Sequence, residues 1–165
     1  MRYSSKQIVF QEIPNEISIA FHITGCPLRC LGCHSSIQRN SELGNDLNED
    51  IFRAEIEKNI DYVSCVLFLG GEWDESQLCK LLDISKAKYL NTALYTGLEF
   101  DEVSSEIKNR LTYLKYGPFV SSLGPLSSSS TNQKLINLKT NECLNHYFLK
   151  ERGVYDSINR NSNSI

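Results

Sequence analysis

The sequence predicts an α/β fold in which parallel strands alternate with helices. Three observations predict it: strand-like and helix-like segments alternate along the chain, the strand-like segments are short, and glycine follows each of them. Such alternation is typical of parallel βαβ units. Four strands of this kind are too few for a closed eight-unit barrel, so the pattern leaves a partial, open barrel and a doubly wound sheet as alternatives.

The first half of the chain supplies two strands and one helix. Residues 17–23 alternate apolar residues with small or polar ones, which indicates a strand. Residues 48–60 place three isoleucines among charged residues, which favours a helix with one buried face. The apolar run in residues 62–69 ends at two glycines and indicates a strand that is buried on both faces.

The second half continues the alternation. Asp74 and Gln77 form a capping-box start for a helix, and apolar residues then follow at helical spacing. A strand at 92–96, a further helix after residue 100 and a strand at 111–116 come next, and 133–139 could form a last short strand. We expect a flexible serine-rich loop at 124–131, a single domain over residues 1–155 and a disordered polar tail over 156–165.

Charge and hydropathy exclude several classes of protein. The 17 basic and 20 acidic residues give a net charge of −3, so no basic surplus indicates a nucleic-acid partner. No apolar run approaches the length of a membrane span, and the N-terminus does not resemble a signal segment. We therefore expect a cytoplasmic protein with reduced thiols, in which Cys65 and Cys79 are small buried hydrophobic residues.

Three clustered cysteines, Cys26, Cys30 and Cys33, directly follow the first predicted strand. Clustered thiolates favour zinc or an iron–sulfur cluster. A structural zinc site normally needs a fourth protein ligand, and the only neighbouring one is His34, next to Cys33. A Cys-x-x-Cys redox pair would leave Cys26 unexplained. Three thiolates on a [4Fe-4S] cluster leave one iron open to a small molecule, so this cluster is the prediction and a zinc-binding module is the alternative.

The cysteine segment, residues 24–34, resembles the signature of the radical S-adenosylmethionine (SAM) superfamily. Within this superfamily, residues 24–34 resemble the short glycyl-radical activases, most closely the activating proteins of anaerobic ribonucleoside-triphosphate reductase. Short motifs extend the resemblance over roughly residues 8–138; they lie at 69–72, 94–99, 116–119 and 131–133. Two positions depart from it: Gly32 stands where many members have an aromatic residue, and Trp73 where many have proline. The sequence favours Trp73 as a core or rim aromatic, with contact to a partner protein as the alternative.

The resemblance implies a fold and a site. The fold would be a partial, open parallel (β/α) barrel of the short radical SAM type. The cysteines would ligate three irons, and the fourth iron would chelate the amino and carboxylate groups of SAM. The residues implied to bind SAM are Gly70, Gly71 and Glu72 at the methionine amino group, Gly32, Cys33 and His34 at the adenine, and Tyr95 and Thr96 in the rest of the pocket.

The resemblance also implies a reaction and its partners. A flavodoxin- or ferredoxin-like donor would reduce the cluster, SAM would be cleaved, and a glycyl radical would form on the large subunit of an anaerobic ribonucleotide reductase. No side-chain acid or base is required, so no catalytic residue is predicted. A radical SAM enzyme acting on a small molecule, such as a deazapurine precursor, is a second alternative, although the motifs at 94–99 and 131–133 disfavour it.

Overall fold

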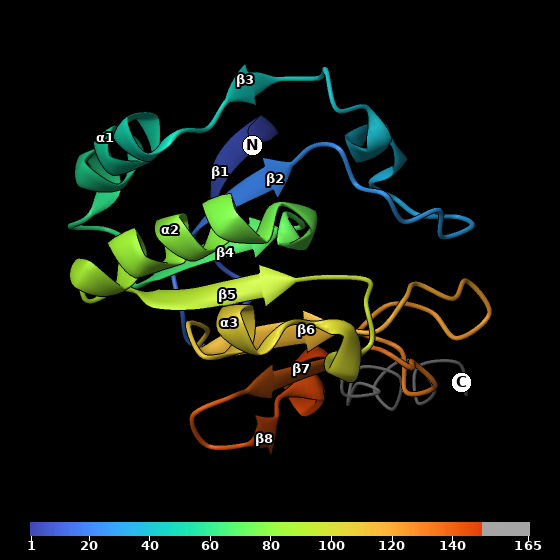
Figure 1. The fold of residues 1–165 in the computed structure, drawn as a ribbon. Coiled ribbons are helices and arrows are strands. Elements are labelled where there is room, and N and C mark those ends of the chain that lie inside the picture. Colours follow the sequence, from blue (N-terminus) through green and yellow to red (C-terminus); the bar gives the residue numbers. More distant parts are fainter. Residues whose placement is uncertain (150–165) are drawn as a thin grey trace, which may run out of the picture.

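One mixed sheet of eight strands runs through the computed structural model, which describes residues 1–149 (Figure 1). Its strand order is β3-β1-β2-β4-β5-β6-β7-β8. The four central strands, β2, β4, β5 and β6, are parallel, and all other neighbours are antiparallel. The strands are β1 (Arg2–Val9), β2 (Ser18–Ile23), β3 (Asn45–Asp46), β4 (Cys65–Leu69), β5 (Asn91–Tyr95), β6 (Tyr113–Tyr116), β7 (Lys134–Asn137) and β8 (Glu142–Cys143).

Three α-helices connect the parallel strands: α1 (Glu49–Asn59), α2 (Glu75–Ala87) and α3 (Ser105–Lys108). The parallel strands follow one another across the sheet in chain order, so right-handed crossovers place these helices on the same face (Figure 1). Short 3₁₀ turns complete the described chain: η1 (Ser36–Arg39), η2 (Glu72–Asp74), η3 (Phe100–Glu102) and η4 (Asn145–Phe148).

The prediction of a partial, open parallel barrel is wrong. The parallel strands form only the centre of the sheet, and antiparallel strands flank them on both sides. A parallel barrel needs a crossover helix after each strand. In contrast, no α-helix separates β1 from β2 or β6 from β7, and each of these pairs is antiparallel. The sheet therefore stays open, with β3 and β8 at its two edges.

Most of the individual elements match their predictions. β2 and β4 lie within the predicted strands, and Asp74 caps α2 by accepting from a main-chain amide, as predicted. Asn48, at which no cap was predicted, caps α1 in the same way. The third helix is shorter than predicted, because Val103 is extended and divides it into η3 and a four-residue α3. The predicted tail at 156–165, and the domain boundary at 155, lie outside the described residues.

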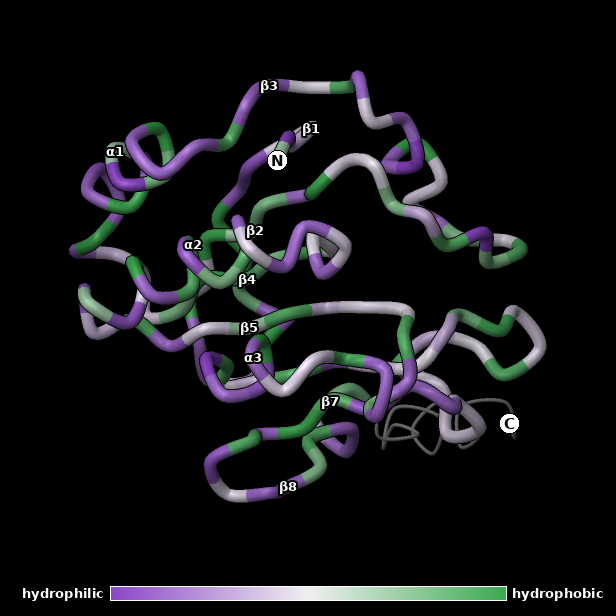
Figure 2. Tube along the Cα trace, in the orientation of Figure 1, coloured by the Kyte–Doolittle hydropathy of each residue, from purple (hydrophilic) through white to green (hydrophobic). Residues whose placement is uncertain are grey.

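Both faces of the sheet are covered. On the helical face, the buried rings of Phe21, Phe52 and Phe68 pack with centroids 5.3–5.9 Å apart. On the other face, Ala20, Cys65 and Leu67 pack beneath the segment after β1 and beneath η4. Figure 2 shows α1 as a mainly hydrophilic helix interrupted by hydrophobic positions, as expected for a helix with one face on the core.

The predictions for two scattered cysteines can be compared with their burial. Cys65 is fully buried, as predicted. Cys79 is only partly buried and packs against the helical-face core from α2. In residues 1–149, none of the helices combines the length and the apolar character needed to cross a membrane.

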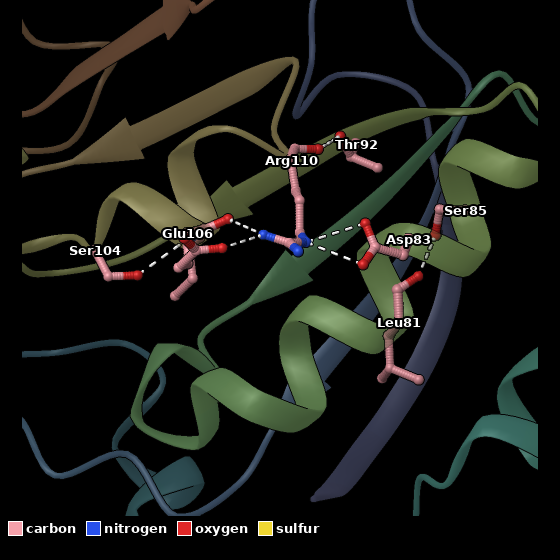
Figure 3. Close-up of polar contacts among 8 residues, drawn as sticks. Leu81, Asp83, Ser85, Thr92, Ser104, Glu106 and Arg110 are labelled. Carbon is pink, nitrogen blue, oxygen red and sulfur yellow. Dashed lines mark hydrogen bonds and ion pairs between the residues drawn. The ribbon is translucent and has the colours of Figure 1, made fainter.

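A partly exposed arginine joins α2 to α3 (Figure 3). Arg110 Nε lies 3.0 Å from both carboxylate oxygens of Asp83, and Nη1 lies 2.8 Å from Glu106 Oε2. The main-chain oxygen of Arg110 accepts a hydrogen bond from Thr92 Oγ1 at 2.7 Å. This set of contacts fixes the short α3 against its neighbours although the helix itself has only four residues.

We expect Phe68→Ala to lower the free energy of unfolding by about 3–5 kcal/mol, because it leaves a cavity between two buried rings. Phe10→Ala is the matched control, since that ring is 67% exposed and its loss should change stability by less than about 0.5 kcal/mol. Urea unfolding of the two variants measures both. Equal losses would contradict the assignment of the core.

Candidate functional site

A pocket of about 210 Å³ lies at the carboxyl ends of the parallel strands. The last residues of β2, β4 and β5 line it, together with the loop that follows β2. Parallel strands end at a common edge of the sheet, and ligands in such folds bind at that edge. The topology therefore brings segments that are far apart in the sequence to one site.

The cysteine loop forms one wall of this pocket. Cys26, Cys30 and Cys33 all line it, and all three thiols are free. The main-chain amide of Cys26 donates to Gln38 O at 3.0 Å, and the guanidinium of Arg39 donates to Cys30 O at 2.8 Å. The η1 turn therefore anchors the loop through its main chain and leaves the three thiols available as ligands.

The three thiols do not form a ready-made site for a single ion in the described residues. Burial raises the pKa of the Cys26 thiol, and the nearby Glu72 carboxylate and the other two thiols add to the shift. A thiolate there needs a compensating cation, as a metal would provide. Across residues 1–149, no three His, Cys, Asp or Glu side chains converge on a single-ion site. Thiolates on a [4Fe-4S] cluster bind separate irons and need not converge on one point.

The turn after β4 forms a second wall. Gly70 and Gly71 have φ of +85° and +111°, which favour glycine. The Trp73 ring covers Gly70, since a Cβ there would lie 2.6 Å from the indole, and its Nε1 lies 3.4 Å from the position of a Cβ on Gly25. Trp73 is partly buried against the core and packs between the turn and the start of the cysteine loop, as the sequence favoured.

Glu72 presents an unsatisfied acceptor in this pocket. Thr96 Oγ1 donates to Glu72 Oε1 at 2.5 Å. The other oxygen, Oε2, is buried and finds no hydrogen-bond partner in the described chain. Burial raises the pKa of the carboxyl group, and the bond from Thr96 opposes that shift. A buried carboxylate with a free oxygen can accept from a cationic donor such as an ammonium group.

Lys115 is a site residue that the sequence analysis missed. It lies on β6, is 9% exposed and lines the pocket. Its Nζ donates to the main-chain oxygens of Thr96 and Gly117, each at 3.4 Å. Burial lowers its pKa to about 8, against the opposing effect of Cys30, Cys33 and Glu72. The available signal was a single lysine inside the otherwise uncharged strand Tyr113–Tyr116.

The structure separates the predicted SAM-binding residues into two groups. One group lines the pocket: Cys33, Gly70, Glu72, Tyr95 and Thr96. The other group does not: Gly32 and His34 are exposed, and Gly71 is buried against Ile23 and Met1. The ring of His34 packs edge-on against Phe119, with centroids 5.5 Å apart.

Other lining residues were not predicted from the sequence. His22, Leu28, Arg39, Phe119 and Gln133 contribute to the pocket. Burial lowers the pKa of His22, which favours its neutral form. Leu28, Phe119 and Gln133 lie in the motif segments 24–34, 116–119 and 131–133, but no role in the pocket was assigned to them from the sequence.

Three free thiols, a buried carboxylate and a buried ammonium around one pocket define a metallocofactor-binding protein. A family model described as a 4Fe-4S single cluster domain matches residues 17–143, and the chain belongs to this family of iron–sulfur proteins. It therefore contains a 4Fe-4S cluster-binding domain. Neither curated proteins nor solved structures gave a significant match to the chain.

We expect Gly70→Ala to destabilise the cluster-free protein more than Gly32→Ala. Both positions have positive φ, which costs a non-glycine residue about 1–2 kcal/mol. A Cβ on Gly70 would also meet the Trp73 ring at 2.6 Å, whereas one on Gly32 would meet nothing closer than 3.7 Å. Thermal unfolding should give an additional loss of about 1–3 kcal/mol for Gly70→Ala. Equal losses of stability in the two variants would show that the Trp73 indole moves aside without a cost in free energy.

We expect the cluster-free protein to become more stable as the pH rises from about 8 to 10.5, relative to Lys115→Met. In this window the folded state has released the Lys115 proton, whereas the unfolded state still binds it, so stability increases with pH. The shift from 10.5 to about 8 corresponds to roughly 3 kcal/mol. Urea unfolding across the window measures the difference between the two proteins. A constant difference would contradict the burial of a charged lysine.

Proposed function

We propose that this protein is a radical SAM activase that generates a glycyl radical on a partner enzyme, the anaerobic ribonucleoside-triphosphate reductase. The observation that carries the proposal is the Cys-x3-Cys-x2-Cys loop, whose three thiols line one pocket at the carboxyl ends of the parallel strands. Membership of the 4Fe-4S family supports the metal part of the proposal. The binding of SAM, the partner enzyme and the electron donor are proposed in addition to the cluster.

Three cysteines and one glutamate are the side chains proposed to hold the cofactors. Cys26, Cys30 and Cys33 ligate the cluster, and their number leaves one iron without a protein ligand. Glu72 offers its free oxygen to the ammonium group of the methionine part of SAM. Bound by these three cysteines, the cluster would supply one electron for the reductive cleavage of SAM, the chemistry that leads to removal of a hydrogen atom from a glycine Cα of the partner.

The remaining residues orient the ligands and restrict water. Thr96 fixes the Glu72 carboxylate by a hydrogen bond, so its second oxygen is presented to the pocket. Leu28 and Phe119 give the lining an apolar part, which excludes water from a reactive radical. Gly70 and Gly71 are proposed at the methionine amino group beside Glu72, Gly32, Cys33 and His34 at the adenine, and Tyr95 and Thr96 in the rest of the pocket. Of these residues, Gly32, His34 and Gly71 do not line the pocket, so their part in binding SAM rests on the resemblance alone.

The surface around the loop supports a macromolecular substrate. Leu31 is 87% exposed and lies within the cysteine loop, and Ile37 is 65% exposed and lies within the anchoring turn η1. Exposed apolar side chains at a site are compatible with contact to another protein, although single ones are common on protein surfaces. A flavodoxin- or ferredoxin-like protein is the proposed electron donor, and a reducing cytoplasm the proposed location, since it keeps the thiols free.

The test is anaerobic reconstitution with iron and sulfide, comparing Cys30→Ser with Cys143→Ser. We expect the first variant to lose the iron–sulfur absorbance and to reduce 5′-deoxyadenosine formation to background, because one cluster ligand is gone. Cys143→Ser should match the wild type, since that thiol is exposed on the edge strand β8 and does not line the pocket.

Electron paramagnetic resonance then tests the substrate. With the reductase present, the wild type should produce a glycyl-radical signal on that partner. SAM cleavage without this signal would favour a small-molecule radical enzyme, and zinc without iron would favour a zinc-binding module. Full SAM cleavage by Cys30→Ser would overturn the proposal.

A further inference from the structure

We propose that Lys115 raises the reduction potential of the cluster by placing a buried positive charge beside the cysteine loop. This inference rests on the proposed ligation of the cluster by Cys26, Cys30 and Cys33. In this role Lys115 acts on the cluster through its positive charge, and it need not contact SAM.

The position of Lys115 is fixed by the sheet. β6 pairs in parallel with β5, and Lys115 lies opposite Tyr95 at the ends of both strands. Its side chain is held on the pocket side by two main-chain oxygens, those of Thr96 and Gly117. With 9% exposure, the ammonium group is largely shielded from water and lines the same pocket as the three thiols.

The charge of Lys115 lacks a carboxylate partner in the described part of the chain. The ion pairs found there do not include it. Glu72 lines the same pocket and favours the charged form of Lys115, but among the described residues it forms no ion pair with Lys115, and its carboxylate accepts from Thr96. A buried cation is costly unless an anion offsets it. The thiolates of Cys30 and Cys33, which favour the charged form of Lys115, are available to do so once they bind metal.

Two arginines near the loop are weaker candidates for this role. Arg29 is exposed and does not line the pocket, so water screens its charge. Arg39 lines the pocket but is only half-buried, and its guanidinium donates to the main-chain oxygen of Cys30. A charge acts more strongly where water is excluded, so Lys115 should have the largest effect.

The sign of the effect follows from charge alone. A cluster held by three thiolates is anionic, and adding one electron makes it more negative. A fixed positive charge stabilises the reduced form more than the oxidised form, so it makes reduction easier. Removing the charge of Lys115 should therefore make the potential more negative.

The experiment uses the cluster-loaded protein under anaerobic conditions, without SAM, in a potential titration followed by absorbance. Lys115→Gln removes the charge but keeps a donor for the two main-chain oxygens, and Lys115→Met is a second neutral variant. We expect both to lower the equilibrium constant for one-electron reduction at least tenfold, which corresponds to about 59 mV. Lys115→Arg should retain most of the wild-type potential.

Lys139→Gln is the matched control, because Lys139 is exposed and donates to Asn91 at the opposite end of the strands. Its potential should equal that of the wild type. An unchanged potential in a neutral Lys115 variant with a full cluster would overturn the inference, even if SAM then bound more weakly. Failure of the wild type to assemble a cluster on the three cysteines would instead overturn the proposed function.

Discussion

The parallel pairing of β2, β4, β5 and β6 in chain order is the constraint on which the site depends. It places the carboxyl ends of these strands along one edge, so each connection begins at the same side of the molecule. The cysteine loop, the Gly70–Glu72 turn, Thr96 and Lys115 come from four different strand ends and reach one pocket for this reason. Right-handed crossovers send the helices to one face, where they build the aromatic core that holds the strands in register.

The pocket combines groups that a protein normally keeps apart from its interior. Within residues 1–149, a carboxylate oxygen without a hydrogen-bond partner, a lysine that forms no ion pair and three free thiols all border the same small volume. Each carries a desolvation cost that the rest of the fold must offset. The two aromatic and aliphatic layers of the sheet supply that stability, since their largest side chains are fully buried. Such an arrangement is typical of a site that completes its charge balance when a cofactor binds.

The sequence predicted the central elements because their signals are local. The apolar run of β4 and the cap Asp74 depend on neighbouring residues, and the structure agrees with them. The outer strands of the sheet were not predicted, because their signals are not local. β1 is a polar, half-exposed strand that forms through pairing with β2, and β3 and β8 are two-residue strands with no periodicity of their own. Without those strands the mixed sheet could not be distinguished from a parallel barrel.

Some residues of the site were predicted from the sequence and others were not, for similar physical reasons. The spacing of Cys26, Cys30 and Cys33 is short-range, so it could be recognised in the chain and the structure brings all three to one pocket. Lys115 became a site residue only through burial, which no spacing encodes. His34 was assigned by its place beside Cys33, yet in the structure it is exposed and contacts Phe119.

The open sheet has a consequence for association between molecules. A barrel hides its main-chain hydrogen-bonding groups by closure, whereas an open sheet leaves a row of them free at each border. Here the borders in the described chain are β3 and β8, each only two residues long. Because β3 pairs with only Arg2 and Tyr3 of β1, and β8 with only Ile136 and Asn137 of β7, a foreign strand would add along the remainder of β1 or β7. The central strands are paired on both sides and take no part in such ribbon-like self-assembly.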